Sequence, residues 1–169
     1  MPFHLFLLRH AETEPQQSGQ SDFDRELLPK GINQIGHLAQ HLSKIAFHPD
    51  SIICSPARRA KTTAMTLIEL LKMPLDKVQF NNSIYTAEAN GLLDLIHETD
   101  NHSQGLFVVG HNPALSDLAT YLVKGFAEGL RTCDFVWIEF NTTQWLDVNK
   151  GTGQLKKLIH ATPLKENNE

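Results

Sequence analysis

The sequence predicts an α/β protein, a three-layer α/β/α sandwich built on a mainly parallel central sheet. Short apolar runs have the length and composition of buried strands, at residues 5–8, 50–55 and 105–110. Amphipathic segments with helical spacing alternate with these runs, which is typical of a parallel sheet covered by helices on both faces. Towards the C-terminus we expect three further strands with antiparallel pairing, at residues 134–140, 144–148 and 155–160.

The first amphipathic segment covers residues 31–47. Its apolar residues recur at helical spacing and predict one buried stripe, made of Ile32, Ile35, Ala39, Leu42 and Ala46. His37 and His41 fall on the other face, four residues apart. Two such imidazoles can share a metal, but the catalytic zinc motif needs a glutamate next to the first histidine, where this chain has Leu38. A solvated polar face is the better interpretation, and no metal site is predicted.

Length and composition limit the other possibilities. The 169 residues are enough for a sizeable core without disulfides, and we expect one domain over residues 1–162 followed by a frayed tail at 163–169. A net charge of −4 indicates no general affinity for nucleic acid or an anionic membrane, so any basic site must be local. No signal peptide or membrane span is recognisable, so we expect a cytoplasmic protein. Cys54 and Cys133 form no metal-spaced pair, and neither is assigned a catalytic role.

Arg9 and His10 directly follow the first predicted strand. Ligands of open α/β sheets bind beyond the carboxyl ends of the strands, so the pair is placed for chemistry. A neutral imidazole is nucleophilic, and a neighbouring guanidinium disfavours its protonation and attracts phosphate. Taken alone, the pair is equally a solvated strand end. Arg25, in the polar loop that follows, could turn towards the same place or remain solvated.

A second strand end carries Ser55, followed by Pro56. Ser55 is a plausible N-cap of a helix that runs to about residue 72, with the proline at its first position. The N-terminus of a helix suits an anion, and Arg58 and Arg59 add full charges there. The alternative is a capped helix with two exposed arginines.

The third strand end is that of residues 105–110, and it delivers His111. Asn112 as N-cap and Pro113 begin the next predicted helix. A histidine at this junction can donate a hydrogen bond to a phosphoryl oxygen, or it can be structural. Glu88 precedes a predicted helix at residues 89–97, where it either stabilises the first turn or projects into the cleft as an acid.

These strand ends together favour phosphoryl transfer. The chain contains no Walker A motif and no dinucleotide-binding glycine pattern, which argues against a nucleotide-dependent kinase or a dehydrogenase. An imidazole nucleophile, several guanidiniums and a helix N-terminus supply what transfer needs, namely positioning and neutralisation of the equatorial oxygens. The sequence resembles the histidine phosphatase superfamily, which is phosphoglycerate mutase-like in fold, and within it the short SixA type of phosphohistidine phosphatase. Four blocks carry the resemblance, in family order: LLRHAE at 7–12, DRELLPKG at 24–31, SPARRAKT at 55–62 and VVGHNP at 108–113.

The resemblance implies a role for each matching residue. His10 would be the nucleophile and form a phosphohistidine intermediate that water hydrolyses. Arg9 and Arg59 would hold the phosphoryl oxygens, His111 would bind the phosphoryl group and stabilise its transfer, and Arg25 matches an arginine directed to phosphate in short members. No metal or organic cofactor is required.

Ser55 and Asn112, at the predicted helix starts, complete the candidate substrate-binding residues. We expect a phosphatase for phosphohistidine on a signalling or phosphotransfer protein, because imidazole is a good leaving group and the chain lacks room for the inserted segment that carries an acid in mutase-like relatives. A phosphatase for a small phosphate ester, with Glu88 as acid, is one alternative. The other is a non-catalytic phosphoprotein-binding module.

Overall fold

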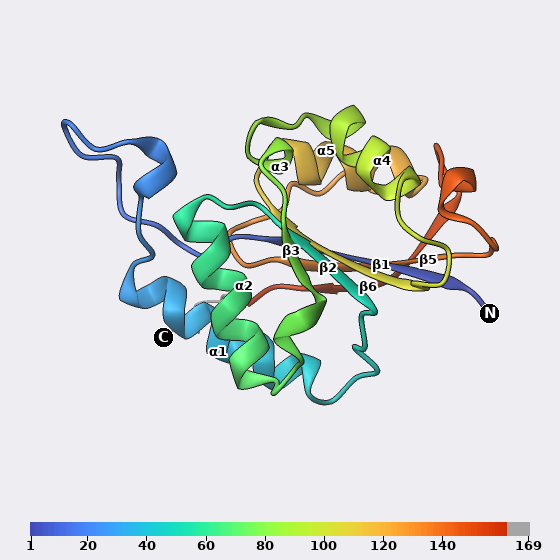
Figure 1. The fold of residues 1–169 in the computed structure, drawn as a ribbon, viewed down its shortest axis with the longest axis horizontal. Coiled ribbons are helices and arrows are strands. Elements are labelled where there is room, and N and C mark those ends of the chain that lie inside the picture. The colour runs from blue at the N-terminus through green and yellow to red at the C-terminus, as the bar shows by residue number, and fades with distance from the viewer. Residues whose placement is uncertain (162–169) are drawn as a thin grey trace, which may run out of the picture.

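The computed structural model describes residues 1–161. Within them, a six-stranded sheet lies between two layers of helices (Figure 1). The strands are β1 (Phe3–Arg9), β2 (Ser51–Cys54), β3 (Val78–Phe80), β4 (Gly105–Gly110), β5 (Phe135–Phe140) and β6 (Gly153–Ile159). One face is covered by α1 (Pro29–Leu42) and α2 (Arg58–Leu70), and the other by α3 (Ser83–Thr86), α4 (Ala89–His97) and α5 (Ala114–Leu122). The predicted α/β/α sandwich is confirmed.

The strand order is β3-β2-β4-β1-β5-β6. β1 is parallel to β4 on one side and antiparallel to β5 on the other, and β6 pairs antiparallel with β5 as predicted. The register pairs Arg9 with Gly110, so β1 and β4 end side by side. The residues that follow them, His10 and His111, therefore leave the sheet at the same edge.

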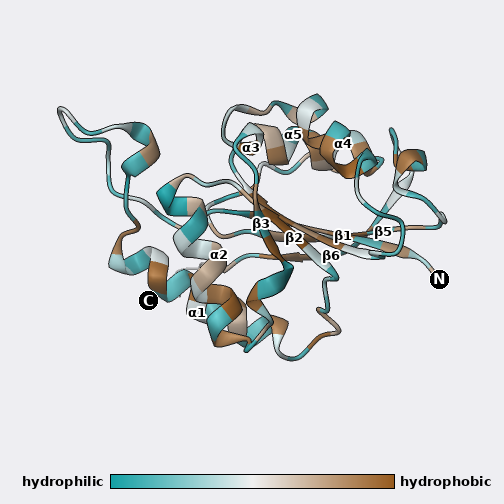
Figure 2. Cartoon of the chain, in the orientation of Figure 1, coloured by the Kyte–Doolittle hydropathy of each residue, from teal (hydrophilic) through white to brown (hydrophobic). Residues whose placement is uncertain are grey.

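Alternate residues of β1 face opposite helical layers. Leu5 and Leu7 belong to the core beneath α4 and α5, whereas Phe6 and Leu8 belong to the core beneath α1 and α2. The hydrophobic colour of the strands between the two layers is visible in Figure 2. Phe6 packs edge-on against Phe47, with ring centroids 4.9 Å apart. Full burial of such a side chain stabilises a fold by about 1.5–3 kcal/mol, so β1 is a firm support for the residues that follow it.

Helix α1 begins earlier and ends sooner than the predicted 31–47. Pro29 is its first residue, a position where the missing N–H costs nothing. The predicted stripe is buried in part, at Ile35, Ala39 and Leu42. It is wrong at Ile32, which is 43% exposed, and at Ala46, which lies beyond the helix, because the buried face runs through Leu38 instead.

The predicted capping residues of two helices are also wrong. α2 starts at Arg58 with Ala57 in the N-cap position, and α5 starts at Ala114 with Pro113 in that position. In both cases a few residues separate the end of the strand from the start of the helix. Ser55 and Asn112 thus lie in the turns above the sheet edge, and their side chains are available for other contacts.

Residues 144–148 do not form the predicted strand. They contain a short 3-10 helix at Trp145–Asp147 instead. Trp145 is fully buried, packs on Phe3 with ring centroids 4.9 Å apart, and donates from Nε1 to the carbonyl of Ser103 at 2.7 Å. This anchoring holds the segment against α4, so the segment does not pair as a strand of the central sheet.

No helix within residues 1–161 is long and apolar enough to cross a membrane. The expected tail at 163–169 lies outside the described residues.

Candidate active site

The carboxyl ends of β1, β2 and β4 meet at a cleft of about 370 Å³. It brings together most of the predicted site, and its lining includes Arg9, His10, Arg25, Arg59, His111 and Asn112. These residues come from strand ends, a loop and the first turn of α2. The cleft is therefore assembled from the segments that the sequence motifs marked separately.

His10 is oriented by contacts with the backbone. Its Nδ1 lies 2.8 Å from the carbonyl oxygen of Ala11. A carbonyl only accepts, so Nδ1 carries the proton and Nε2 keeps its lone pair. Ala11 is held in turn, since its N–H donates to Thr63 Oγ1 at 3.0 Å. The ring is 7% exposed, and burial, with added repulsion from His111, Arg59 and Arg9, lowers the pKa of His10 to about 3. The imidazole is neutral at physiological pH and can act as a nucleophile.

His111 lies beside it, with the two ring centroids 5.4 Å apart. Its Nε2 is 2.7 Å from Ser55 Oγ, and that oxygen accepts a hydrogen bond from the Ala57 N–H at 3.2 Å. The Ser55 hydroxyl has no other acceptor among the described residues, so we assign its proton to the bond with Nε2, which leaves the His111 proton on Nδ1. Burial, followed by repulsion from Arg59, lowers the pKa of His111 to about 4. This ring is a neutral hydrogen-bond donor near neutral pH.

Three buried nitrogens of the site have no acceptor among the described residues: Arg9 Nε, Arg59 Nε and His111 Nδ1. The side chains that carry them line the same cleft as His10. Each buried donor without an acceptor lowers the stability of the fold by about 1–3 kcal/mol, so three such donors in one cleft are considerably destabilising. Donors of this kind suit the oxygens of a tetrahedral oxyanion. The set fits a phosphoryl group placed over the His10 ring.

Two residues that the sequence reasoning missed, Asp22 and Tyr85, contact the arginines that line the cleft. Asp22 Oδ2 accepts from Arg59 Nη2 at 3.0 Å and from the Tyr85 hydroxyl at 2.7 Å. Arg25 bonds the other carboxylate oxygen at 3.0 Å and Thr13 Oγ1 at 2.6 Å, so it turns towards the site rather than into solvent. The sequence contains no spacing pattern that marks Asp22 or Tyr85, because both act through contacts between distant loops.

The side chains of Ser55 and Asn112, predicted to bind substrate, both make hydrogen bonds within the protein. Ser55 is 0% exposed and lies behind His111, so its geometry supports a positioning role. Asn112 lines the cleft, but its amide is engaged, with Nδ2 donating to the Leu130 carbonyl at 2.7 Å and Oδ1 accepting from Ser116. Arg58, by contrast with Arg59, is exposed and pairs with Glu26 at 2.7 Å.

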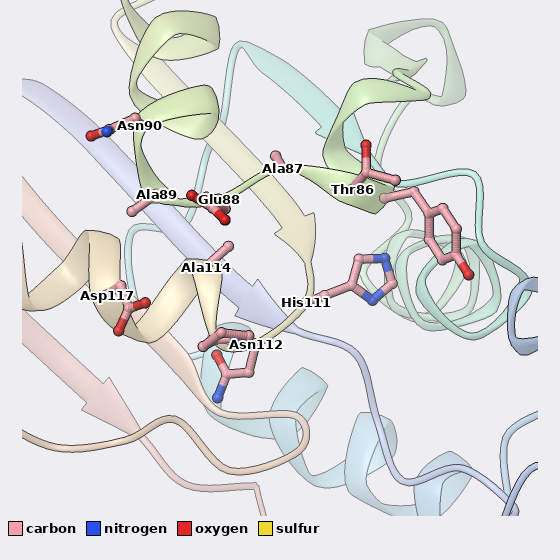
Figure 3. Close-up of a pocket in the computed structure, with 11 residues that line it drawn as sticks. Thr86, Ala87, Glu88, Ala89, Asn90, His111, Asn112, Ala114 and Asp117 are labelled. Atoms are coloured by element: carbon pink, nitrogen blue, oxygen red, sulfur yellow. The ribbon is translucent and has the colours of Figure 1, made fainter.

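A second and larger cavity of about 580 Å³ adjoins the cleft and shares His111 and Asn112 with it. Figure 3 shows His111 at one side of this cavity, with Glu88 at the start of α4 and Asp117 on α5 at the other. Glu88 is exposed and makes no side-chain cap to its helix. The structure thus places Glu88 in the adjoining cavity and not among the residues that surround His10. Asp117 was not singled out from the sequence.

Comparison with known sequences shows a similarity over part of the chain. Residues 5–80, somewhat less than half of the chain, match the sequence model of the histidine phosphatase superfamily (branch 1). An uncharacterised protein of Mycobacterium tuberculosis is 27% identical over 158 residues, which cover 88% of this chain and 96% of that protein. This similarity to the superfamily supports a phosphatase activity.

Solved structures share the fold. A protein of Agrobacterium tumefaciens assigned as the phosphohistidine phosphatase SixA superposes with a TM-score of 0.80 at 21% identity, covering 95% of this chain and 99% of that one. The protein histidine phosphatase SixA in complex with tungstate gives a TM-score of 0.78 at 17% identity, covering 94% and 97%. These likenesses extend over nearly the whole length of each chain and show that the fold is shared.

The described residues contain no group of three or more His, Cys, Asp or Glu side chains placed to hold a metal ion. Cys54 and Cys133 are both fully buried in the core, and burial raises the pKa of each thiol to about 12.

Proposed function

We propose that this protein is a phosphatase that forms a covalent phosphohistidine intermediate on His10 and acts on phosphohistidine of a signalling or phosphotransfer protein. One observation carries the proposal. Three buried donors without protein acceptors, Arg9 Nε, Arg59 Nε and His111 Nδ1, share a cleft with a neutral imidazole.

In the first step, His10 Nε2 attacks the phosphorus atom. The new P–N bond forms as the bond between phosphorus and the substrate imidazole breaks, and the departing imidazole takes the bonding electron pair and then a proton. The guanidiniums of Arg9 and Arg59 and the Nδ1–H of His111 neutralise the equatorial oxygens during transfer. Phosphorylation places positive charge on the His10 ring, and the Ala11 carbonyl, held at Nδ1, stabilises it.

In the second step, a water molecule attacks the phosphorus in line with His10 Nε2. The P–N bond breaks, its electron pair returns to Nε2, and the water's oxygen leaves as part of inorganic phosphate. The same three donors serve both steps because the phosphorus stays in one place while its axial partners exchange. His10 is neutral again and can begin another cycle.

The adjoining cavity supports a choice of substrate. Its lining contains two carboxylates, Glu88 and Asp117, and no lysine or arginine. A leaving group that enters it meets negative charge, which disfavours small esters that carry a carboxylate of their own. A neutral imidazole on a protein surface avoids this penalty. The cavity is open to solvent at Glu88, which is exposed, so a folded partner can reach it.

A small phosphate ester is the second candidate, because Glu88 faces the same cavity as His111 and could protonate an alkoxide leaving group. The two candidates make different demands on this residue. Glu88→Gln should lower ester hydrolysis strongly if Glu88 is an acid, and should change phosphohistidine hydrolysis less than about threefold if imidazole leaves without help.

The decisive experiment compares hydrolysis of a phosphohistidine-bearing phosphotransfer domain with that of para-nitrophenyl phosphate and 3-phosphoglycerate at neutral pH. We expect preference for the domain, loss of all turnover in His10→Ala, and normal turnover in the matched control His37→Ala, whose side chain is exposed on α1. A labelled phosphoryl group should appear transiently on the wild-type protein and be lost in acid.

Other outcomes are equally informative. Preference for the esters would assign the protein to small-molecule substrates. Turnover that survives in His10→Ala would contradict the mechanism. A partner that binds wild type and His10→Ala equally, with no turnover in either, would identify a binding module.

A further inference from the structure

We propose that the carboxylate of Asp22 competes with the phosphoryl group for Arg59, and so weakens the hold of the site on phosphate. This inference rests on the proposed function, since it concerns the same cleft. It makes Asp22 a residue that sets oxyanion affinity, a role that no sequence motif of the chain indicates.

The contacts of Arg59 are the first step. Its Nη1 donates to the backbone oxygen of Asp22 at 2.7 Å, and its Nη2 donates to Oδ2 of the same residue at 3.0 Å. Both ends of the guanidinium fork are thus directed at one acidic residue. Only Nε, which is buried, has no acceptor among the described residues. Each Nη nitrogen carries a second N–H, but a phosphoryl group that binds the guanidinium end-on, at Nη1 and Nη2, must displace the two Asp22 oxygens from them.

The surroundings of Asp22 are the second step. Its carboxylate is also bound by the Tyr85 hydroxyl at 2.7 Å and by Arg25 Nη1 at 3.0 Å. Two guanidiniums and a hydroxyl are also the kind of donors that bind a phosphoryl group. The carboxylate of Asp22, a residue of the protein itself, therefore occupies donors that a substrate could use.

Charge is the third step. The hydrogen bond from Tyr85, with those from Arg25 and Arg59, lowers the pKa of Asp22 to about 2, so this carboxylate is ionised throughout the physiological range. The Arg59 side chain is 8% exposed and Asp22 is 38% exposed. Screening by solvent is weak on the arginine side of the pair. A phosphoryl group that binds Arg59 is consequently repelled by the negative charge of Asp22 across the same guanidinium. This repulsion weakens the binding of the phosphoryl group.

The position of Asp22 in the fold makes release possible. It begins a single 3-10 turn, Asp22–Asp24, in the loop that extends beyond the sheet at the left of Figure 1. Within the described residues, the bridge between Thr13 and Leu27 pairs the two stems of this loop with each other, and the Asp22–Asp24 turn pairs with no strand of the central sheet. Asp22 can move away from Arg59 without breaking a strand pairing or a long helix.

The competing explanation is that Asp22 only positions Arg59 and Tyr85. The two explanations predict opposite signs. Removing a competitor raises oxyanion affinity, whereas removing a support lowers it. The test is calorimetric titration of inorganic phosphate, and separately of tungstate, into wild type, Asp22→Asn and Asp22→Ala.

We expect both variants to bind phosphate about tenfold more tightly than wild type, as expected for loss of one like charge at a weakly screened site. Asp22→Asn keeps the shape and can still accept from Tyr85, so it serves as the variant that folds if the alanine does not. Asp24→Asn is the matched control: it removes one charge from the same turn without a side-chain contact to Arg59, and should change affinity less than twofold.

Affinity in Asp22→Asn that is equal to or weaker than that of wild type would overturn the proposal and assign Asp22 a supporting role. The measurement does not depend on turnover. Failure of the proposed function would instead appear as hydrolysis that survives in His10→Ala, so the two failures are distinguishable.

Discussion

The site has two parts that differ in how the fold holds them. His10 and His111 follow adjacent parallel strands whose register pairs Arg9 with Gly110, and both rings are restrained by backbone or buried side-chain partners. Asp22 and Arg25, by contrast, are carried by a loop outside the sheet. The two histidines proposed to react thus follow paired strands of the sheet, whereas the residue proposed to adjust affinity lies in a loop that pairs with none of its strands.

The sharpest test of this division uses two neighbouring residues of α2. Arg59 is buried in the cleft, whereas Arg58 is exposed and pairs with Glu26. Arg59→Ala should lower kcat/KM by about 10³, because it removes a fixed donor to the charge that develops in the transition state. Steady-state kinetics with the preferred substrate measure the change.

Arg58→Ala is the control and should stay within twofold of wild type. Arg59→Lys keeps the charge but loses the planar fork, and we expect it to recover only part of the loss. Equal losses for the two alanine variants would show that charge near the helix start, and not placement in the cleft, supports activity.

The sheet-held histidines should also make stability depend on pH. The folded pKa values of about 3 for His10 and about 4 for His111 lie below the ordinary value of 6.5. The unfolded chain therefore binds more protons, so this contribution is fully present above pH 6.5 and is lost as the pH falls towards the folded values. Denaturant unfolding at pH 7 and pH 4.5 should show a loss of the order of 2 kcal/mol for each histidine.

The double variant His10→Gln, His111→Gln should lose correspondingly less stability between these two pH values. His37→Gln, which changes an exposed histidine, should behave as wild type does. Asp22 does not affect the comparison of pH 7 with pH 4.5, because its pKa is lowered to about 2. The stability that its carboxylate contributes to the fold is lost only as the pH falls from 3.8 towards 2. A wild-type protein that is equally stable at both values would contradict the burial of neutral rings.

The same contrast between sheet and loop separates the residues that the sequence predicted from those that it could not predict. The apolar runs of β1 and β4 and the residues directly after them led to the α/β/α fold and to His10 and His111, because local pattern and the geometry of parallel strands determine both. The segment at 144–148 was mistaken for a strand since burial of Trp145 against Phe3 is a tertiary contact. Asp22 and Tyr85 were missed for the same reason: they lie 63 positions apart and meet only in the folded chain.

The smallest expected effect concerns Ser55, whose hydroxyl forms a hydrogen bond with the His111 ring. Ser55→Ala removes the hydroxyl that donates to His111 Nε2, so the ring no longer has a fixed tautomer. We expect kcat to fall about tenfold with little change in KM, the size of one lost hydrogen bond in the transition state. Nitrogen NMR shifts of the His111 ring should change from a proton on Nδ1 to a mixture of tautomers.

Ser55→Thr keeps the hydroxyl and should restore most of the rate and the wild-type tautomer. Ser51→Ala, at the other end of β2, removes a half-buried hydroxyl that bonds Ser103 Oγ at 2.7 Å and should leave both readouts unchanged. A purely structural role for Ser55 would lower the stability of the alanine variant but leave the His111 tautomer as it is. A shift of the tautomer together with the loss in kcat would instead show that this buried serine prepares His111 as a hydrogen-bond donor.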